Sequence, residues 1–421
     1  MQLFATTAWG IETLTAEELT RLGAADVRAT AGGVHFAGDH RILYRALLGL
    51  RTATRVLRPL REFAAAHAEM LYSQVRRVRW EDWIAPTGTL AVSATLQGRG
   101  LRQAAPAEAA PESAAPQTRP SATRGRRSER RTTDEAAGRE AEPRKGLIHS
   151  HYAALKIKDA ICDRLRRERG ARPNVDVEKA DLRVHAHFAN GRCTLSLDAA
   201  GTSLHERGYR KQSGEAPLRE TLAAAVVLFS GWDGEGPLLD PMCGAGTLAI
   251  EAALWGRRKA PGLGRRFACW NWPDFDQAIW DEEAARAREN EKRLPVPIVA
   301  RDVDRRVLDL ARDNARRAGV ENDVRFECTA FEESVPPAAG AGRGTLLINP
   351  PYGERLGSSE EVAALYQRMG AVLQERYRGW TAWVLVGNLT LARQIPLRAA
   401  ERIKLMNGAL ECRLLRFDLG P

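Results

Sequence analysis

Residues 238–252 of the chain read LLDPMCGAGTLAIEA, and this order of residue types predicts a strand, a tight turn and a helix. Two leucines end the short apolar strand, Asp240 lies at its tip, and a helix is expected over residues 247–254. Gly244 and Gly246 in the turn lack a Cβ, so the backbone there can approach a ligand closely. The N-terminus of the following helix is favourable for a polar ligand group. The stretch therefore predicts an α/β domain that binds a nucleoside-bearing ligand at this strand end.

A second motif, LLINPPYG at residues 346–353, likewise follows an apolar strand, which is expected at residues 345–348. It places Asn349, Pro350 and Tyr352 beyond the carboxyl end of that strand. Open α/β sheets bind their ligands in the crevice at the carboxyl ends of the strands. We therefore expect the two motifs to face one crevice.

The Asn-Pro-Pro-Tyr motif suits transfer of a methyl group to the exocyclic amine of a nucleobase. That amine is a poor nucleophile, because its lone pair is delocalised into the ring. The side-chain oxygen of Asn349 and the carbonyl of Pro350 can each accept one N–H hydrogen bond and so aim the lone pair at an incoming methyl. The ring of Tyr352 offers a flat face on which a flipped-out base can stack. These three residues are the candidate catalytic residues.

A nicotinamide-dependent enzyme is an alternative interpretation of the glycine turn. Residues 244–249 formally fit the dinucleotide fingerprint, which also requires an acidic residue about 20 residues further on. The next expected strand, residues 298–300, comes far later and argues against that alternative. Asp302 follows this strand and is a candidate ligand of ribose hydroxyls, with a solvated loop acid as the other interpretation. Asp304 is expected to cap a helix over residues 305–318.

The chain has 421 residues, enough for two or three domains, and 63 Lys and Arg against 53 Asp and Glu give a net charge of +10. A basic chain favours a polyanionic partner such as nucleic acid. No apolar run reaches the roughly 18 residues of a membrane helix, and the N-terminus has no signal-peptide pattern, so we expect a cytoplasmic protein without membrane attachment. No metal site is expected, because the six cysteines form no C-x-x-C pair and the pairs His149/His151 and His185/His187 lack partners at ligand spacing.

Residues 99–146 consist mainly of Ala, Pro, Glu and Arg and contain one large aliphatic residue, Leu101. Such a segment cannot bury enough apolar surface to offset its ordering entropy, so a disordered insertion is expected. Short α/β and hairpin elements on either side suggest a substrate-binding module attached to the larger α/β domain. They are strands near residues 3–5, 32–37, 181–188 and 193–198, the last two joined by an Asn190-Gly191 turn, and helices at residues 12–23, 42–49 and, with a basic face, 152–169.

Seven sequence blocks, in order, make the chain resemble the THUMP-domain methyltransferases that form N2-methylguanosine in RNA. The resemblance is greatest to the bacterial branch that acts on large-subunit ribosomal RNA, whose members are often labelled N6-adenine-specific DNA methylases. It covers nearly the whole chain apart from residues 99–146. The blocks are KDAICDRLRRERGARPNVD (158–176), LSLDAAGTSLHERGYR (195–210), APLRETLAAAVV (216–227), PLLDPMCGAGTLAIEAA (237–253), APGLGRRFACWNWPDFD (260–276), INPPYGERLG (348–357) and NGALECRLLRFDL (407–419).

This resemblance implies a Rossmann-like methyltransferase domain at residues 206–421 that uses S-adenosylmethionine. It also implies a ferredoxin-like segment at residues 1–65 and a THUMP RNA-binding domain at residues 66–205, interrupted by the insertion. Motif by motif, it assigns the target guanine to Asn349, Pro350 and Tyr352, and the cofactor to Asp240, Pro241, Cys243, Gly244, Gly246, Thr247, Asn349 and, at its ribose, Asp302.

The chain departs from the family pattern at one position. Similar sequences often carry an acid near the end of the next strand to hold the adenine amine, but here Ala330 precedes Phe331. We therefore expect adenine to rest against Phe331 and backbone groups, with Glu332 as a substitute partner.

The implied activity is transfer of a methyl group from S-adenosylmethionine to the N2 amine of a guanosine in RNA, with 23S ribosomal RNA as the first choice of substrate. Guanine-N2 methylation of transfer RNA and adenine-N6 methylation of DNA or RNA stay open, because Asn-Pro-Pro-Tyr serves either amine. A non-catalytic RNA-binding protein is disfavoured by the intact Asp240, glycines and Asn349.

Overall fold

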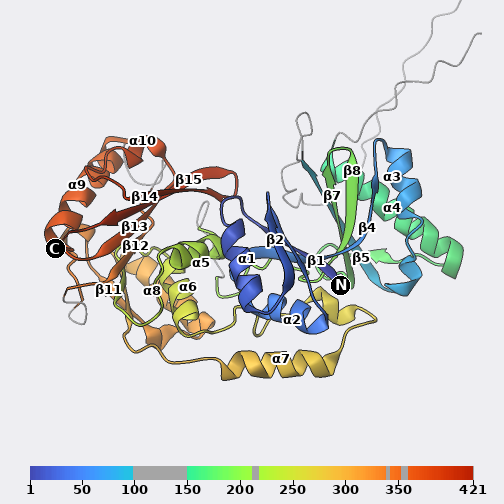
Figure 1. Cartoon of the computed structure of the whole chain (residues 1–421), viewed down its shortest axis with the longest axis horizontal. Coiled ribbons are helices and arrows are strands. Elements are labelled where there is room, and N and C mark those ends of the chain that lie inside the picture. Colours follow the sequence, from blue (N-terminus) through green and yellow to red (C-terminus); the bar gives the residue numbers. More distant parts are fainter. Residues whose placement is uncertain (98–148, 211–217, 338–341, 352–358, 421) are drawn as a thin grey trace, which may run out of the picture. The chain divides into compact units, whose positions relative to one another are not determined.

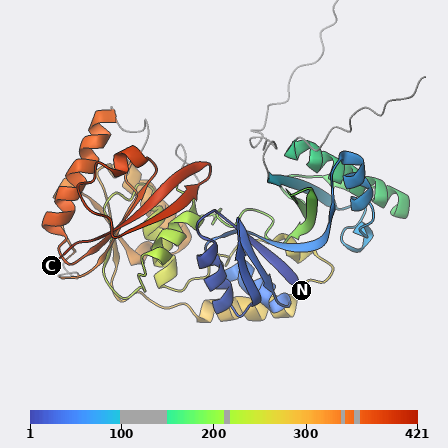
Figure 2. The same cartoon turned by 45° about the horizontal axis from the view of Figure 1, so that its top comes forward.

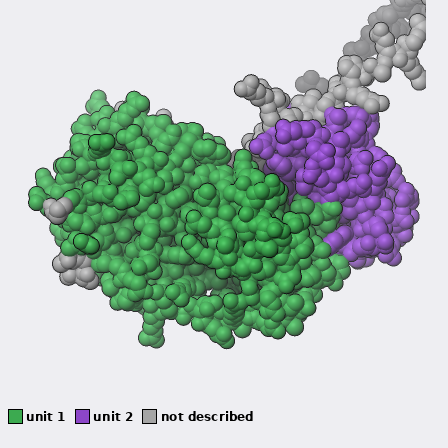
Figure 3. Space-filling view, in the orientation of Figure 1, with its two compact units in different colours: residues 1–60, 178–183, 196–421 green, residues 61–177, 184–195 purple. Residues whose placement is uncertain are grey.

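The computed structural model describes residues 1–97, 149–210, 218–337, 342–351 and 359–420 (Figure 1). The insertion expected at residues 99–146 lies outside these ranges. The chain divides into two compact units (Figure 3), the first made of residues 1–60, 178–183 and 196–421 and the second of residues 61–177 and 184–195. In the described ranges no helix combines the length and the apolar character that a membrane span needs.

A seven-stranded sheet in the order β11-β10-β9-β12-β13-β15-β14 lies at the centre of the C-terminal part of the first unit (Figure 1). Neighbouring strands from β11 to β13 are parallel, and β15 is antiparallel to both of its neighbours. The strands are β9 (Leu238–Asp240), β10 (Ile298–Asp302), β11 (Val324–Cys328), β12 (Thr345–Ile348), β13 (Thr381–Val386), β14 (Glu401–Asn407) and β15 (Leu410–Asp418).

Helices cover both faces of this sheet, which explains why its strands are nearly continuous apolar runs (Figure 2). Leu238 belongs to a core cluster with residues of α5, α6 and α8. Its neighbour Leu239 points to the other face and joins a cluster with residues of α9. The helices of this part are α5 (Glu220–Phe229), α6 (Thr247–Gly256), α7 (Gln277–Glu289), α8 (Arg305–Ala318), α9 (Ser359–Arg376) and α10 (Leu389–Ala392).

The strand order reverses at β9, whose neighbours are β10 on one side and β12 on the other. At such a point the chain leaves the sheet in opposite directions, and a crevice opens outside the carboxyl ends of the strands. The two motifs follow β9 and β12, so the fold brings them to this crevice as expected. The α/β, Rossmann-like fold class is confirmed.

The N-terminal residues of the same unit form four strands in the order β2-β3-β1-β4 with two helices, and the last residues of β4 belong to the second unit. They are β1 (Gln2–Thr7), α1 (Glu12–Arg21), β2 (Ala25–Thr30), β3 (Gly33–Ala37), α2 (His40–Gly49) and β4 (Ala53–Ala64). The expected strands and helices are confirmed here. The sequence did not indicate β2, because ADVRAT is largely exposed and has no apolar alternation. Its register against β3 also shifts near Asp26, which has a φ of +52°.

The second unit contains strands in the order β8-β7-β5-β6, of which β7 begins and β8 ends in the first unit. The hairpin expected at Asn190-Gly191 is confirmed: both residues have positive φ, 51° and 74°, and they join β7 to β8. Gly170, with a φ of +73°, ends the long basic helix α4 as expected. The elements are α3 (Ala68–Val75), η1 (Trp80–Asp82), β5 (Thr89–Gln97), α4 (Ser150–Arg169), β6 (Asn174–Val175), β7 (Leu182–Ala189) and β8 (Arg192–Asp198).

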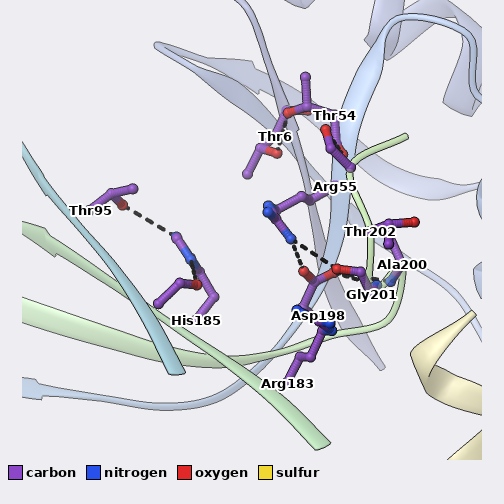
Figure 4. Close-up of polar contacts among 12 residues, drawn as sticks. Thr6, Thr54, Arg55, Thr95, Arg183, His185, Asp198, Ala200, Gly201 and Thr202 are labelled. Carbon is purple, nitrogen blue, oxygen red and sulfur yellow. Dashed lines mark hydrogen bonds and ion pairs between the residues drawn. The ribbon is translucent and has the colours of Figure 1, made fainter. Parts of the chain in front are cut away.

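The two histidines of β7 form hydrogen bonds with hydroxyl groups of β5. His185 lies between Ser93 and Thr95 of β5, at 2.9 Å and 3.2 Å, and His187 lies 3.0 Å from Thr95. Figure 4 shows the Thr95 contact and, separately, the buried carboxylate of Asp198, which pairs with Arg55. These contacts indicate structural roles for the two histidines and for Asp198.

Candidate active site at the carboxyl ends of the parallel strands

A cavity of about 370 Å³ lies in the crevice beyond β9, β10, β11 and β12. Both sequence motifs contribute to its walls, as the strand order requires. It is lined by Leu218, Pro241, Met242, Gly244, Asp302, Val303, Ala330, Phe331, Glu332, Asn349, Pro350, Pro351 and Leu365.

Gly244 and Asp302 form the best-defined polar corner of this cavity. Gly244 has a φ of +53°, and a Cβ built on it would meet open space, so the cavity reaches its backbone. Its N–H donates to Asp302 Oδ2 at 2.9 Å, and the N–H of Asp304 donates to Oδ1 at 3.0 Å. Both oxygens of the Asp302 carboxylate are thus held by backbone N–H groups, unlike those of a solvated loop acid. Each oxygen keeps a free lone pair that can accept a ligand hydroxyl.

Asp240 lies behind the cavity wall and is 1% exposed. Its Oδ1 accepts a weak hydrogen bond from the N–H of Met242 at 3.4 Å, while Oδ2 has no partner among the described residues. Burial, and next the nearby charge of Asp302, raise the pKa of this carboxyl well above its usual value. A buried acceptor without a donor is unfavourable, so the site fits a ligand that brings a donor or a positive charge.

Three other expected cofactor residues shape the turn and are not in the wall. Gly246 has a φ of +83°, and a Cβ there would lie 3.1 Å from Ala311 Cβ, so it allows α6 to pack closely against α8. The hydroxyl of Thr247 accepts from Arg210 at 2.6 Å. The N–H of Cys243 donates to the carbonyl of Arg301 at 2.8 Å, and burial raises the pKa of its thiol.

Asn349 lines the cavity directly beyond β12, and its Oδ1 is buried without a partner among the described residues. Pro350 and Pro351 continue the wall, and the hydroxyl of Tyr366 donates to the carbonyl of Pro351 at 3.2 Å. An unused amide oxygen on a braced backbone is the acceptor that an exocyclic amine needs. Tyr352 lies outside the described residues.

Phe331 and Glu332, the two residues expected near the adenine, both line the cavity, and their contact with adenine stays a prediction. Phe331 is buried and offers an apolar wall. Glu332 is paired with Arg368 of α9, Nε to Oε1 at 2.9 Å. The carboxylate that would replace the missing acid is therefore already engaged.

Four apolar residues and one buried amide escaped sequence reasoning. Val303 is 72% exposed directly after Asp302, and this apolar residue at a strand end was the one available signal. Asn314, fully buried in α8, donates to the carbonyl of Ala245 at 3.1 Å and so fixes the glycine turn. The signal in the sequence is this single polar residue among the apolar residues on the buried face of α8. The remaining wall residues, Leu218, Met242 and Leu365, carry no local signal.

Three family models match the chain in order. The RlmL ferredoxin-like domain matches residues 2–57, the THUMP domain residues 144–198, and the RMKL-like methyltransferase domain residues 207–416.

Curated relatives match along the whole chain. The ribosomal RNA large subunit methyltransferase K/L of Syntrophotalea carbinolica is 41% identical over 431 residues, covering 100% of this chain and 54% of that protein. The protein of the same name from Methylococcus capsulatus is 38% identical, and the match covers 99% of this chain and 51% of that protein. The chain therefore spans about half the length of these relatives. A candidate RNA methyltransferase of Synechocystis sp., slr0064, is 37% identical over 418 residues, and the match covers 99% of this chain and 96% of slr0064.

Solved structures agree over the same length. SMU.472, a candidate methyltransferase complexed with S-adenosylhomocysteine, has a TM-score of 0.78 at 27% identity. The match covers 100% of this chain and 98% of the SMU.472 chain. A predicted N6-adenine-specific DNA methylase of Listeria monocytogenes has the same TM-score of 0.78 and identity of 27%, covering 100% and 96%. The chain belongs to the family of methyltransferases that join an RlmL ferredoxin-like domain, a THUMP domain and an RMKL-like methyltransferase domain.

Proposed function

We propose that the chain transfers the methyl group of S-adenosylmethionine to the exocyclic N2 amine of a guanosine in RNA, with 23S ribosomal RNA as substrate. The observation that carries this proposal is the buried Oδ1 of Asn349, which has no partner among the described residues and lies in the cavity that also holds Gly244 and Asp302. The names of the K/L relatives support ribosomal RNA, and the complex of SMU.472 supports the cofactor.

The residues around Gly244 fit the cofactor. S-adenosylmethionine supplies an electrophilic methyl on a positively charged sulfur. Asp302 would accept hydrogen bonds from the ribose hydroxyls, and Phe331 would pack against the adenine. Oδ2 of Asp240, which no described residue contacts by a hydrogen bond, would favour the positive end of the methionine moiety. Pro241 would contact the cofactor from the cavity wall, whereas Cys243, Gly246 and Thr247 would act by holding the turn in this shape.

The residues around Asn349 would hold the target amine. Its Oδ1 and the carbonyl of Pro350 would each accept one N–H, which turns the amine lone pair toward the methyl. Tyr352 is proposed, on sequence grounds, to stack on the flipped base. No strong base is required, because the amine becomes acidic once it is methylated. Catalysis would rest mainly on positioning, which contributes up to about 7–11 kcal/mol in well-oriented reactions.

RNA binding is proposed for the N-terminal modules, with domain limits at residues 1–65, 66–205 and 206–421. The THUMP match at residues 144–198 includes α4, which has Arg166, Arg167 and Arg169 in its last turn. Exposed arginines on such a helix neutralise backbone phosphates without reading sequence. The reaction would take place where ribosomal RNA is made, in the cytoplasm.

The decisive experiment incubates the full chain with labelled S-adenosylmethionine and unmodified 23S ribosomal RNA, transfer RNA or double-stranded DNA. The nucleic acid is then digested and the labelled nucleoside identified. We expect N2-methylguanosine from the ribosomal RNA alone. Label in transfer RNA alone would reassign the substrate, and N6-methyladenine would reassign the target amine, as the name of the Listeria structure suggests for that protein.

A further inference from the structure

A second cavity, of about 480 Å³, lies in the first compact unit and shares no lining residue with the cavity at Asn349. Its walls come from α1 and α2 of the N-terminal part and from α7 and the C-terminal end of α6. No step of the proposed methyl transfer uses it.

Five arginines and two glutamates line this cavity, so its walls carry an excess of positive charge. Both glutamates are already engaged within the protein. Glu18 accepts the backbone N–H groups of Arg51 and Thr52 at 2.9 Å and 3.1 Å. Glu283 accepts from Arg45, Nε to Oε2 at 2.7 Å and Nη2 to Oε1 at 3.0 Å.

Two of the arginines make no hydrogen bond to a carboxylate of the described residues. The exposed side chain of Arg258 has no hydrogen-bond or ion-pair partner in the described part of the chain, and Arg286 comes no closer than 3.9 Å to Glu283. Arg258 also has a φ of +55°, which side-chain-bearing residues rarely adopt. Its backbone is held there by a bond from its N–H to the carbonyl of Trp255 at 2.9 Å. Strain of this kind persists where the surrounding structure fixes a residue in place.

Arg51 is only 6% exposed and completes the cationic wall. Its Nη2 donates to the carbonyl of Lys259 at 2.7 Å, and its guanidinium lies 5.5 Å from the centre of the Trp255 ring. Its Nη1 has no partner among the described residues. A nearby anion would offset the cost of burying this charge.

We propose that this cavity binds the phosphate group of a nucleotide. Guanidinium groups match phosphate oxygens in charge and geometry, and Arg258 and the weakly paired Arg286 can supply them. Apolar walls at Leu22, Leu48 and Trp255 suit the attached nucleoside. The phosphate can belong to an RNA backbone or to a free mononucleotide. This site does not depend on the methyl-transfer proposal.

The test is calorimetric titration of the full chain, first saturated with S-adenosylhomocysteine so that adenosine 5′-monophosphate cannot enter the other cavity. The two probes are that mononucleotide and a short single-stranded RNA without a terminal phosphate. The double variant R258E/R286E should bind at least one probe about 10-fold more weakly, as expected for lost charged hydrogen bonds. The matched control is R288E, which reverses a charge on the same helix outside the cavity.

Weaker binding of the mononucleotide alone identifies a free nucleotide as ligand, and weaker binding of the RNA alone identifies a backbone phosphate. Equal losses in R288E, or none in the double variant, would overturn the site. Arg258→Gly guards against misfolding, because it removes the cation and relieves the positive φ. It should keep or raise the unfolding temperature while weakening probe binding. Failure to bind S-adenosylhomocysteine would count only against the methyl-transfer proposal.

Discussion

Asn349 is proposed to act on the target amine after cofactor and RNA have bound. Asn349→Ala should therefore lower the single-turnover methyl-transfer rate with saturating RNA by about 100-fold, as for a lost transition-state contact. Affinity for S-adenosylhomocysteine should stay within about twofold by the same reasoning. Asn388→Ala is a matched control, because that side chain accepts from the N–H of Thr390 at 2.9 Å and caps α10. A near wild-type rate in Asn349→Ala would refute the proposed mechanism.

Asp240 is expected to stabilise the cofactor complex while destabilising the free protein. Because its pKa is raised in the folded state, the unfolded chain loses this proton first as pH rises. Folding stability is then lost above the ordinary pKa of an aspartate. Asp240→Asn, which cannot ionise, should raise the melting temperature of the free protein at pH 7 and have little effect near pH 4, about the unperturbed pKa.

The same substitution should weaken S-adenosylhomocysteine binding, because the amide offers no charge to the ligand. Calorimetry measures this second effect. Unchanged affinity together with a lower melting temperature at pH 7 would show that Asp240 is a packing residue only.

The sequence motifs located three residues of the cavity, because each lies at or shortly after the end of an apolar strand. Gly244, Asp302 and Asn349 all line the cavity. They could not locate Leu218, which lies just before α5, or Leu365 of α9, because neither residue follows a strand of the sheet. Nor could they separate wall residues from supporting ones: Gly246 and Thr247 hold the turn from behind, and only their tertiary contacts reveal this.

At the level of elements, patterns with an end signal were predicted best. The helix expected at residues 305–318 has those limits, because Asp304 accepts from the N–H of Arg306 at 2.8 Å and Gly319 ends it with a φ of +69°. Strand β2 was missed because its exposed residues are ordered by backbone pairing with β3 and not by an apolar face.

Helix α4 is joined to η1 by a two-pronged ion pair. Arg164 donates to Glu81 from Nε at 2.8 Å and from Nη2 at 2.6 Å, which lowers the pKa of Glu81 to about 2. A lowered pKa contributes stability above the ordinary value of 4.5, and this contribution is lost as pH falls toward about 2. Glu81→Gln should therefore lower the urea midpoint at pH 7, and the difference from wild type should shrink below pH 4.5.

Glu168→Gln in α4 is the control, since Glu168 pairs with the exposed Arg167 at the surface. It should change the midpoint little at either pH. A loss of stability in Glu81→Gln that is the same at pH 7 and at pH 3 would contradict the ionic origin.

At the scale of the whole molecule, the N-terminal residues 1–60 and the methyltransferase part form one compact unit. Tyr44 of α2 packs against Phe275 and Trp280, with ring centres 5.4 Å away in both cases. A Cβ on Gly262 would lie 2.4 Å from the carbonyl of Leu47, so the two parts touch through their backbones. Composition indicated separate modules, but it could not show this contact, which is made by residues more than 200 positions apart.

Glu283 of α7 tests how strongly this contact stabilises the unit. Its carboxylate is 2% exposed and accepts from Arg41 Nη1 at 2.7 Å and from Arg45 Nε at 2.7 Å. Removing one partner of a buried ion pair leaves the other charges uncompensated. Glu283→Gln should therefore lower the free energy of unfolding by about 2 kcal/mol, the scale of lost hydrogen bonds to charged groups.

Glu282→Gln provides the comparison, because Glu282 pairs with the same Arg41 but is 61% exposed. Surface pairs contribute little, so that variant should unfold within about 0.5 kcal/mol of wild type. Both are measured by urea denaturation of the full chain. If the two variants lose stability equally, α2 and α7 are not held together by this carboxylate. If only Glu283→Gln is destabilised, a fragment that begins at residue 206 should unfold more readily than the full chain, because it lacks both arginines and the apolar face of α2.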